Sequence, residues 1–287
     1  MTTAKPSLYT LPFFLLCLSN FLFSASFSMI IPELPDYLAS LGGKEYIGYT
    51  IALFTLAAGF SRPFSGKLTD HVGRIPIMAF GSLVCFICGG LYPLMHTVQG
   101  FLFLRFIHGM STGTKPTATA AYVSDVIPED RRGEAQGGLG IFTATGMSIG
   151  PAIGSFLAAE YGIDQMFYIS SVFALASIII LSRMKETLPK AMKSRLSLSL
   201  FRIGWKDVFE PKIVPVFWIM LFVSFSAGAM MSYQLACQVP HRVKAAFAVS
   251  GQLRGSLPAC KPSVPVVLHH LHGTADTDMA LEGRVAQ

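Results

Sequence analysis

The apolar segment at residues 98–123 contains two basic residues, a histidine and several hydroxyl residues. Arg105, His108, Thr112 and Lys115 occur at i, i+3, i+7 and i+10, a spacing that places them on one face of a helix. Ionisable groups inside a bilayer are costly and usually face a partner or a water-filled cavity. We therefore predict that this face lines a polar cavity and does not meet lipid, and that Lys115 there would suit an anionic substrate. Two alternatives stay open: His108 as a packed polar residue, and Lys115 as a side chain that reaches the inner membrane interface.

A short charged stretch, residues 66–74, separates two apolar runs. Gly66 and Gly73 permit a tight turn and a close approach of helices. Asp70 and Arg74 are placed to pair with neighbouring loop charges or with helix ends. The stretch predicts a loop that fastens helices together on one side of a membrane, and a purely structural turn is the alternative.

Small residues recur at four-residue spacing in another apolar segment, residues 139–159. Gly146, Gly150 and Gly154 would lie on one side of a helix, and Pro151 stands among them. Small residues at this spacing let two helix backbones approach closely, and a proline adds a kink. The pattern predicts a tightly packed helix–helix interface.

The composition is typical of a membrane protein. The mean hydropathy is +0.53 and charged residues make up 13% of the chain, whereas soluble domains have about 25%. The net charge of +6 is spread among loops, which indicates membrane orientation and argues against nucleic-acid binding. The five cysteines form no metal-like set, since Cys85 and Cys88 lie inside an apolar run. We therefore expect no metal site and no cofactor.

The apolar segments predict an all-α membrane protein with six to seven transmembrane helices. A spanning helix needs roughly 20 mostly apolar residues. Six segments qualify, at 11–31, 47–65, 77–95, 98–123, 139–159 and 166–182, and a seventh lies at 213–233. We accordingly divide the chain into a six-helix unit (1–183), a basic cytoplasmic linker with an amphipathic pattern suited to the inner membrane surface (184–212), the seventh segment (213–233) and a tail (234–287).

The basic residues alternate between loops. The turns after the second, fourth and sixth segments hold Lys67 and Arg74, then Arg131 and Arg132, then the basic run at 183–195, whereas the other turns hold little beyond Lys44. Excess Lys and Arg mark the cytoplasmic side. We therefore predict a multi-pass protein of the cell's inner (plasma) membrane with a cytoplasmic N-terminus.

Three of these patterns resemble motifs of the major facilitator superfamily. Gly66, Asp70, Gly73 and Arg74 match G-x-x-x-D-x-x-G-R, a loop that acts as a conformational latch in that family. Arg105 with Gly109 and Gly113 resembles the family's fourth-helix motif, whose arginine is associated with proton coupling. The run from Gly146 to Gly154, with Pro151, resembles the fifth-helix motif of the family's antiporters. The resemblance implies a major facilitator fold and export in exchange for protons.

The tail resembles another family altogether. The stretch around Ser226 is similar to the nucleophile elbow of polyhydroxybutyrate-depolymerase-like and feruloyl-esterase-like α/β-hydrolases, and Asp276 matches the position of their triad acid. A triad also needs a later histidine, and none follows Asp276 in this sequence. We expect an incomplete hydrolase-like tail that does not fold on its own, and no enzymatic activity.

The sequence thus favours a truncated or fused transporter for a small molecule, with efflux by proton antiport as the leading hypothesis. The expected partners are the lipid bilayer, a small-molecule substrate and protons as the coupling ion, but not nucleic acid. Two alternatives remain: a membrane-tethered serine esterase, and a half-size transporter that pairs with a second half or a second copy of itself.

Overall fold

The computed structural model describes residues 10–189, and all of its regular structure in that range is helical. The seven α-helices are α1 (Leu11–Ile30), α2 (Leu34–Ser40), α3 (Ile47–His71), α4 (Arg74–Leu91), α5 (Val98–Val126), α6 (Arg132–Tyr161) and α7 (Ile163–Ser182). Short 3₁₀ turns precede α2, α3 and α6 and follow α4, at Ile31–Glu33, Lys44–Tyr46, Glu129–Arg131 and Tyr92–Leu94 respectively. The six long helices correspond to the six apolar segments of residues 1–183.

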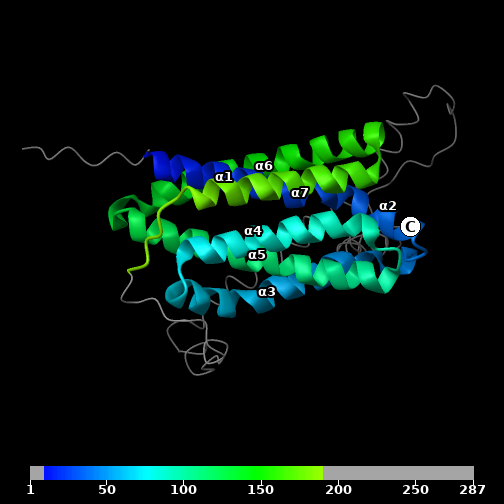
Figure 1. Ribbon diagram of the computed structural model, residues 1–287, viewed down its shortest axis with the longest axis horizontal. Coiled ribbons are helices and arrows are strands. Elements are labelled where there is room, and N and C mark those ends of the chain that lie inside the picture. Colours follow the sequence, from blue (N-terminus) through cyan, green and yellow to red (C-terminus); the bar gives the residue numbers. More distant parts are fainter. Residues whose placement is uncertain (1–9, 190–287) are drawn as a thin grey trace, which may run out of the picture. The chain divides into compact units, whose positions relative to one another are not determined.

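The long helices form two groups of three (Figure 1). In one group α1 packs between α6 and α7, and in the other α5 packs between α3 and α4. The groups meet where α4 lies against α7. Sharp reversals connect consecutive antiparallel helices, because Gly73 before α4 and Gly162 before α7 take φ values of +133° and +90°, which residues other than glycine rarely adopt.

Glycines set how closely the helices approach within each group. A Cβ on Gly146 of α6 would lie 2.6 Å from the carbonyl oxygen of Phe21 in α1, and one on Gly154 would overlap the carbonyl of Met29. A Cβ on Gly113 of α5 would likewise overlap Ala58 and Ser61 of α3. The backbones of α1 and α6 therefore lie close together at Gly146 and Gly154, as small residues at four-residue spacing allow.

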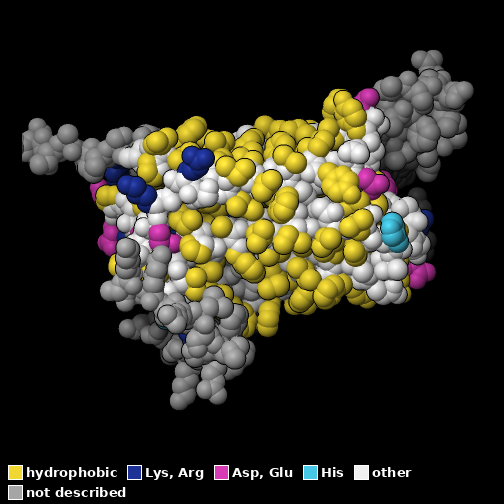
Figure 2. All heavy atoms as spheres, in the orientation of Figure 1, with side chains coloured by type: hydrophobic (Ala, Val, Ile, Leu, Met, Phe, Trp, Pro, Cys, Tyr) yellow, Lys and Arg dark blue, Asp and Glu magenta, His cyan; other side chains and the backbone are white. Residues whose placement is uncertain are grey.

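The outside of the bundle is apolar between its two ends. Figure 2 shows hydrophobic side chains across the middle of one face and charged side chains gathered toward the ends. Within residues 10–189, four helical stretches are long and apolar enough to cross a membrane by length and composition: Leu11–Ser40, Arg74–Leu94, Glu129–Tyr161 and Ile163–Ser182. Helices α3 and α5 have 25 and 29 residues, which is sufficient length, but they carry the charged residues discussed below.

The turn between α3 and α4 is shorter than the sequence predicts. The stretch 66–74 was expected to be a loop, but α3 continues to His71, so Gly66 and Asp70 are helical and the turn narrows to Val72 and Gly73. Gly66 does not mediate a close approach either, because a Cβ there would meet nothing within 4 Å. The linker, the seventh segment and the tail lie beyond residue 189, outside the described residues, and those domain boundaries stay predictions.

Candidate functional site

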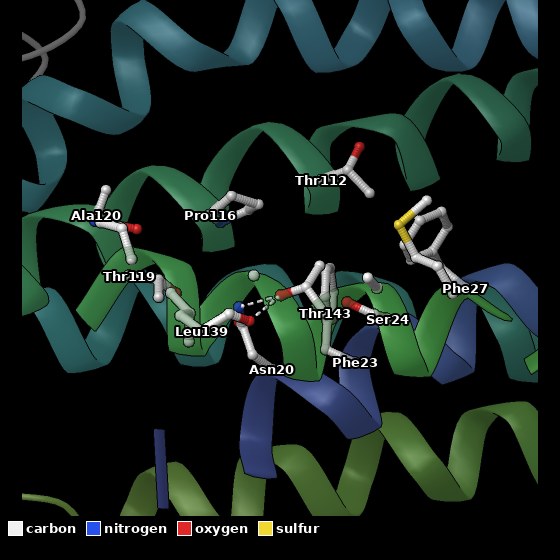
Figure 3. Close-up of a pocket in the computed structure, with 14 residues that line it drawn as sticks. Asn20, Phe23, Ser24, Phe27, Thr112, Pro116, Thr119, Ala120, Leu139 and Thr143 are labelled. Atoms are coloured by element: carbon white, nitrogen blue, oxygen red, sulfur yellow. Dashed lines mark hydrogen bonds between the residues drawn. The ribbon is translucent and has the colours of Figure 1, made fainter. Parts of the chain in front are cut away.

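An open cleft of about 440 Å³ lies between α1, α5 and α6 (Figure 3). Its wall combines aromatic, aliphatic and uncharged polar side chains, and none of them is acidic or basic. The lining residues are Asn20, Phe23, Ser24 and Phe27 of α1; Thr112, Pro116, Thr119 and Ala120 of α5; and Gln136, Leu139, Gly140, Thr143, Ala144 and Met147 of α6. A mostly apolar cleft with a few polar groups is the usual form of a small-molecule site.

A hydrogen bond between two lining residues fixes the orientation of one polar group in the cleft wall. Asn20 Nδ2 donates to Thr143 Oγ1 at 3.1 Å, as Figure 3 shows, and Thr143 Oγ1 donates in turn to the carbonyl oxygen of Leu139 at 3.0 Å. The Thr143 hydroxyl donates its one proton to Leu139, so it must accept from Asn20. This bond sets the orientation of the Asn20 amide. The second N–H and the Oδ1 of Asn20 remain as polar groups at the cleft.

Lys115 lies behind the cleft wall rather than in it. Its side chain is fully buried, and Nζ donates to Ser19 O, Ser19 Oγ and Ser177 Oγ at 3.0, 3.0 and 2.6 Å. The three acceptors match the three protons of an ammonium group. Nζ also lies 4.6 Å from the centre of the Phe23 ring. Lys115 therefore joins α5 to α1 and α7, and its ammonium group is buried inside the helix bundle.

Arg105 and His108 share a second buried cluster. Arg105 Nε donates to Thr50 O, and its Nη1 to the Tyr92 hydroxyl, both at 3.4 Å, while its guanidinium carbon stands 4.4 Å from the centre of the Phe54 ring. The His108 ring bonds the Tyr92 hydroxyl through Nδ1 at 3.1 Å and approaches Cys85 Sγ through Nε2 at 3.3 Å. Within residues 10–189 no carboxylate pairs with Arg105 or Lys115.

The four polar residues of α5 thus separate into two environments. We expected all four to line the cavity, but only Thr112 does so, with its hydroxyl donating to Gly109 O at 2.9 Å. Arg105, His108 and Lys115 are at most 3% exposed and face α1, α3, α4 and α7. Their roles in substrate contact or coupling remain predictions.

The charged residues of the 66–74 stretch form a network with other helix ends. Arg74 bridges Asp70 at 3.3 Å and Asp125, at the end of α5, at 2.9 Å, and its Nη1 donates to Thr69 O at 2.7 Å. The Asp70 side chain is 64% exposed, so that pair adds little stability, whereas the Asp125 pair is better shielded. Arg74 therefore fastens the end of α3 and the start of α4 to the end of α5.

A carboxylate beyond α7 completes this network. Glu186 accepts from the backbone N–H groups of Arg74 and Ile75 at 2.9 and 3.1 Å, which are otherwise unpaired at the start of α4. The Glu186 carboxylate lies against the Gly73 backbone, where a Cβ would overlap it. This position explains why residue 73 is a glycine: it must take a positive φ and leave room for the capping carboxylate.

Pro151 lies inside α6, which continues as one helix from Arg132 to Tyr161. Gly150 of the same motif would place a Cβ 2.8 Å from the Ala25 carbonyl oxygen. The motif therefore forms the α1–α6 contact on one side of the cleft, and its link to antiport remains a prediction. Ser226 and Asp276, the hydrolase-like candidates, lie outside the described residues.

Several residues of the site escaped the sequence analysis. Asn20 is the only asparagine in the chain and interrupts an apolar run, and Glu186 is the only acidic residue in the basic stretch 183–206. Both signals were available from the sequence. The serines that hold Lys115, and the tyrosine shared by Arg105 and His108, had no such signal, since they are distant in sequence and meet only in the packed bundle.

The comparisons with known proteins agree with this architecture. The Major Facilitator Superfamily model matches residues 16–253, a range that includes Ser226, and it lends no support to the hydrolase resemblance. The chain is 31% identical over 211 residues to the multi-drug resistance efflux pump PmrA of Streptococcus pneumoniae, covering 71% of this chain and 51% of that protein. It is 26% identical over 222 residues to the quinolone resistance protein NorA of Staphylococcus aureus, covering 75% of this chain and 55% of the relative.

Solved structures share the fold. The human organic anion transporter MFSD10 aligns with a TM-score of 0.56 at 19% identity, over 65% of this chain and 51% of that one; at this identity the likeness concerns the fold alone. The chain spans about half the length of the curated relatives it matches. With helices long and apolar enough to cross a membrane several times, and a family match over most of its length, the chain belongs to the Major Facilitator Superfamily.

Proposed function

We propose that this chain provides one six-helix half of a transporter that exports a small molecule across a membrane. The observation that supports this proposal most directly is the cleft between α1, α5 and α6. Its aromatic and uncharged polar wall suits an apolar ligand with a few hydrogen-bonding groups. Transporters of this class bind substrate near the bilayer midplane between two repeats. The names of the relatives, efflux and resistance proteins, support export as the direction.

The proposal includes proton antiport and a defined orientation. The alternating basic loops support a cytoplasmic N-terminus in the inner membrane. Arg105 is the proposed coupling residue, since it is a buried cation without a carboxylate partner in residues 10–189. Its interaction energy would therefore change when a proton or a charged substrate binds nearby. A second half, or a second copy of the chain, would close the cleft from the other side.

A pair of tryptophan substitutions on α6 tests the cleft. Gly140 lines the cleft and Gly133 does not, and a Cβ at either position meets nothing within 4 Å. Gly140→Trp should therefore fill the cleft without disturbing helix packing, and Gly133→Trp is the matched control. We expect Gly140→Trp to abolish binding of a fluorescent quinolone to the full chain in nanodiscs, and its pH-gradient-driven movement in proteoliposomes, while Gly133→Trp retains both.

The readouts separate the parts of the proposal. Equal binding by Gly140→Trp and wild type would remove the cleft from the transport pathway. Binding without any movement of the quinolone would support the cleft and contradict transport by the chain on its own. Movement that persists without a pH gradient would contradict proton antiport.

A further inference from the structure

One buried cation, Lys115, stands directly behind the aromatic wall of the cleft, and a second, Arg105, stands one ring further away. Lys115 Nζ is 4.6 Å from the centre of the Phe23 ring, and Phe23 lines the cleft. The Arg105 guanidinium is 4.4 Å from the centre of the Phe54 ring, which stacks at 6.3 Å on Phe27, another lining residue. A cation on an aromatic face interacts with the negative face of the ring, and the Phe23 and Phe54 rings each have one.

Among the described residues, no negative charge balances these cations near the cleft. Within residues 10–189 neither cation has a carboxylate partner, and the oxygens around them belong to serine, threonine and tyrosine residues. The described residues that line the cleft include no Asp or Glu. Fields from buried charges are screened much less than those at a surface. With both side chains protonated, Lys115 and Arg105 would place the cleft at a positive potential within this half of the protein.

The polar groups of the wall can also receive an anion. The hydroxyl of Ser24 and the amide of Gln136 line the cleft and make no hydrogen bond with another residue in the described range. Asn20 has a second N–H left after its bond to Thr143. Three groups that can donate hydrogen bonds thus line the cleft in front of these cations, and a carboxylate oxygen accepts well from such donors.

We propose that the cleft selects aromatic molecules that carry a negative charge, such as an aromatic carboxylate, over neutral and cationic analogues. This inference rests on the proposed function, because it names the substrate class of the same cleft. Lys115 supplies much of the selectivity through its charge, which acts on the substrate through the Phe23 ring. Lys115 does not contact the substrate itself.

The test uses three probes of one shape. 2-Naphthoate, 2-naphthamide and 2-naphthylmethylammonium differ in charge on a shared ring system, and their dissociation constants for the full chain are measured by equilibrium dialysis in nanodiscs of neutral phosphatidylcholine, with empty nanodiscs subtracted. We expect the carboxylate to bind about tenfold more tightly than the amide, the effect of one unit charge at about 10 Å for an effective dielectric of about 20. The ammonium probe should bind most weakly.

Two variants isolate the charge. Lys115→Met keeps a long side chain and removes the cation, so the preference for the carboxylate over the amide should shrink several-fold while amide binding is retained. Gln136→Glu adds a carboxylate to the cleft at almost constant shape and should shift the preference toward the ammonium probe. Lys44→Gln is the control for net charge, because it removes an exposed charge at the turn before α3, distant in sequence from the lining residues. This variant should bind the three probes in the same order of affinity as the wild-type chain.

The outcomes are distinct. Equal or tighter binding of the ammonium probe by the wild-type chain would overturn the inference and leave the cleft as a substrate site. Binding of none of the three probes would overturn the cleft itself and with it the proposed function. If Lys115→Met does not fold, the order of the three probes on the wild-type chain and on Gln136→Glu still decides the question.

Discussion

Glu186→Gln should weaken the attachment between the chain beyond α7 and the start of α4. Glu186 Oε1 accepts from the backbone N–H groups of Arg74, Thr187 and Leu188 at 2.9, 3.0 and 3.1 Å, and Oε2 accepts from that of Ile75 at 3.1 Å. A glutamine can keep the oxygen at the first position, but its NH₂ group then faces the Ile75 N–H. The substitution removes one hydrogen bond and the negative charge at a helix N-terminus.

These losses set the expected magnitude. One hydrogen bond contributes about 1 kcal/mol and the charge at the helix end roughly 0.5 kcal/mol, so the free energy of unfolding should fall by about 1.5 kcal/mol. For a unit of this size that corresponds to a decrease in melting temperature of about 3–6 °C. Glu186 is only partly buried, which argues against a larger effect.

The assay is thermal unfolding of the purified chain in detergent, combined with hydrogen exchange. Glu45→Gln is the matched control, because Glu45 is exposed at the turn before α3 and undergoes the same change in charge. We expect faster exchange of the amides at residues 74–77 in Glu186→Gln only. A melting temperature within the range of Glu45→Gln, together with unchanged exchange at residues 74–77, would show that Glu186 does not cap α4.

Four further predictions concern topology, packing, coupling and the tail. In a cysteine-free version of the chain, single cysteines at Lys44 and His96 should react with an impermeant maleimide in intact cells, and one at Arg132 only after permeabilisation; labelling of Arg132→Cys from outside would reverse the orientation. Gly154→Ala should lower the free energy of unfolding by about 1–3 kcal/mol because its Cβ overlaps the Met29 carbonyl, whereas Gly137→Ala, which meets nothing within 4 Å, should be neutral or stabilising by up to about 1 kcal/mol; equal effects in thermal unfolding would contradict the packing argument. Arg105→Ala, in a transporter that combines this half with a second one, should abolish proton-driven efflux at unchanged protein abundance, and normal efflux would exclude Arg105 from coupling. The purified chain should hydrolyse a short-chain ester no faster than its Ser226→Ala variant, since a serine without a base is a weak nucleophile, and serine-dependent turnover would refute this.

The sequence alone determined the helices because their signal is local. Each spanning segment must be long and apolar whatever it packs against, so the six expected segments match α1 and α3 to α7 to within a few residues at most ends. The larger differences are at polar ends, such as α3, which continues through Gly66 and Asp70 to His71. Backbone hydrogen bonds extend a helix beyond the apolar core, and a hydropathy pattern does not register those extra turns.

Only the tertiary structure decided what the polar side chains contact. Arg105, His108, Thr112 and Lys115 share a helix face in sequence, yet the neighbours of α5 leave Thr112 at the cleft and bury the other three against different helices. Helical spacing fixes the direction of a side chain, but not whether a helix, a cleft or lipid lies in that direction. The acceptors of Lys115 come from residues 19 and 177, far from it in the sequence, and packing alone brings them together.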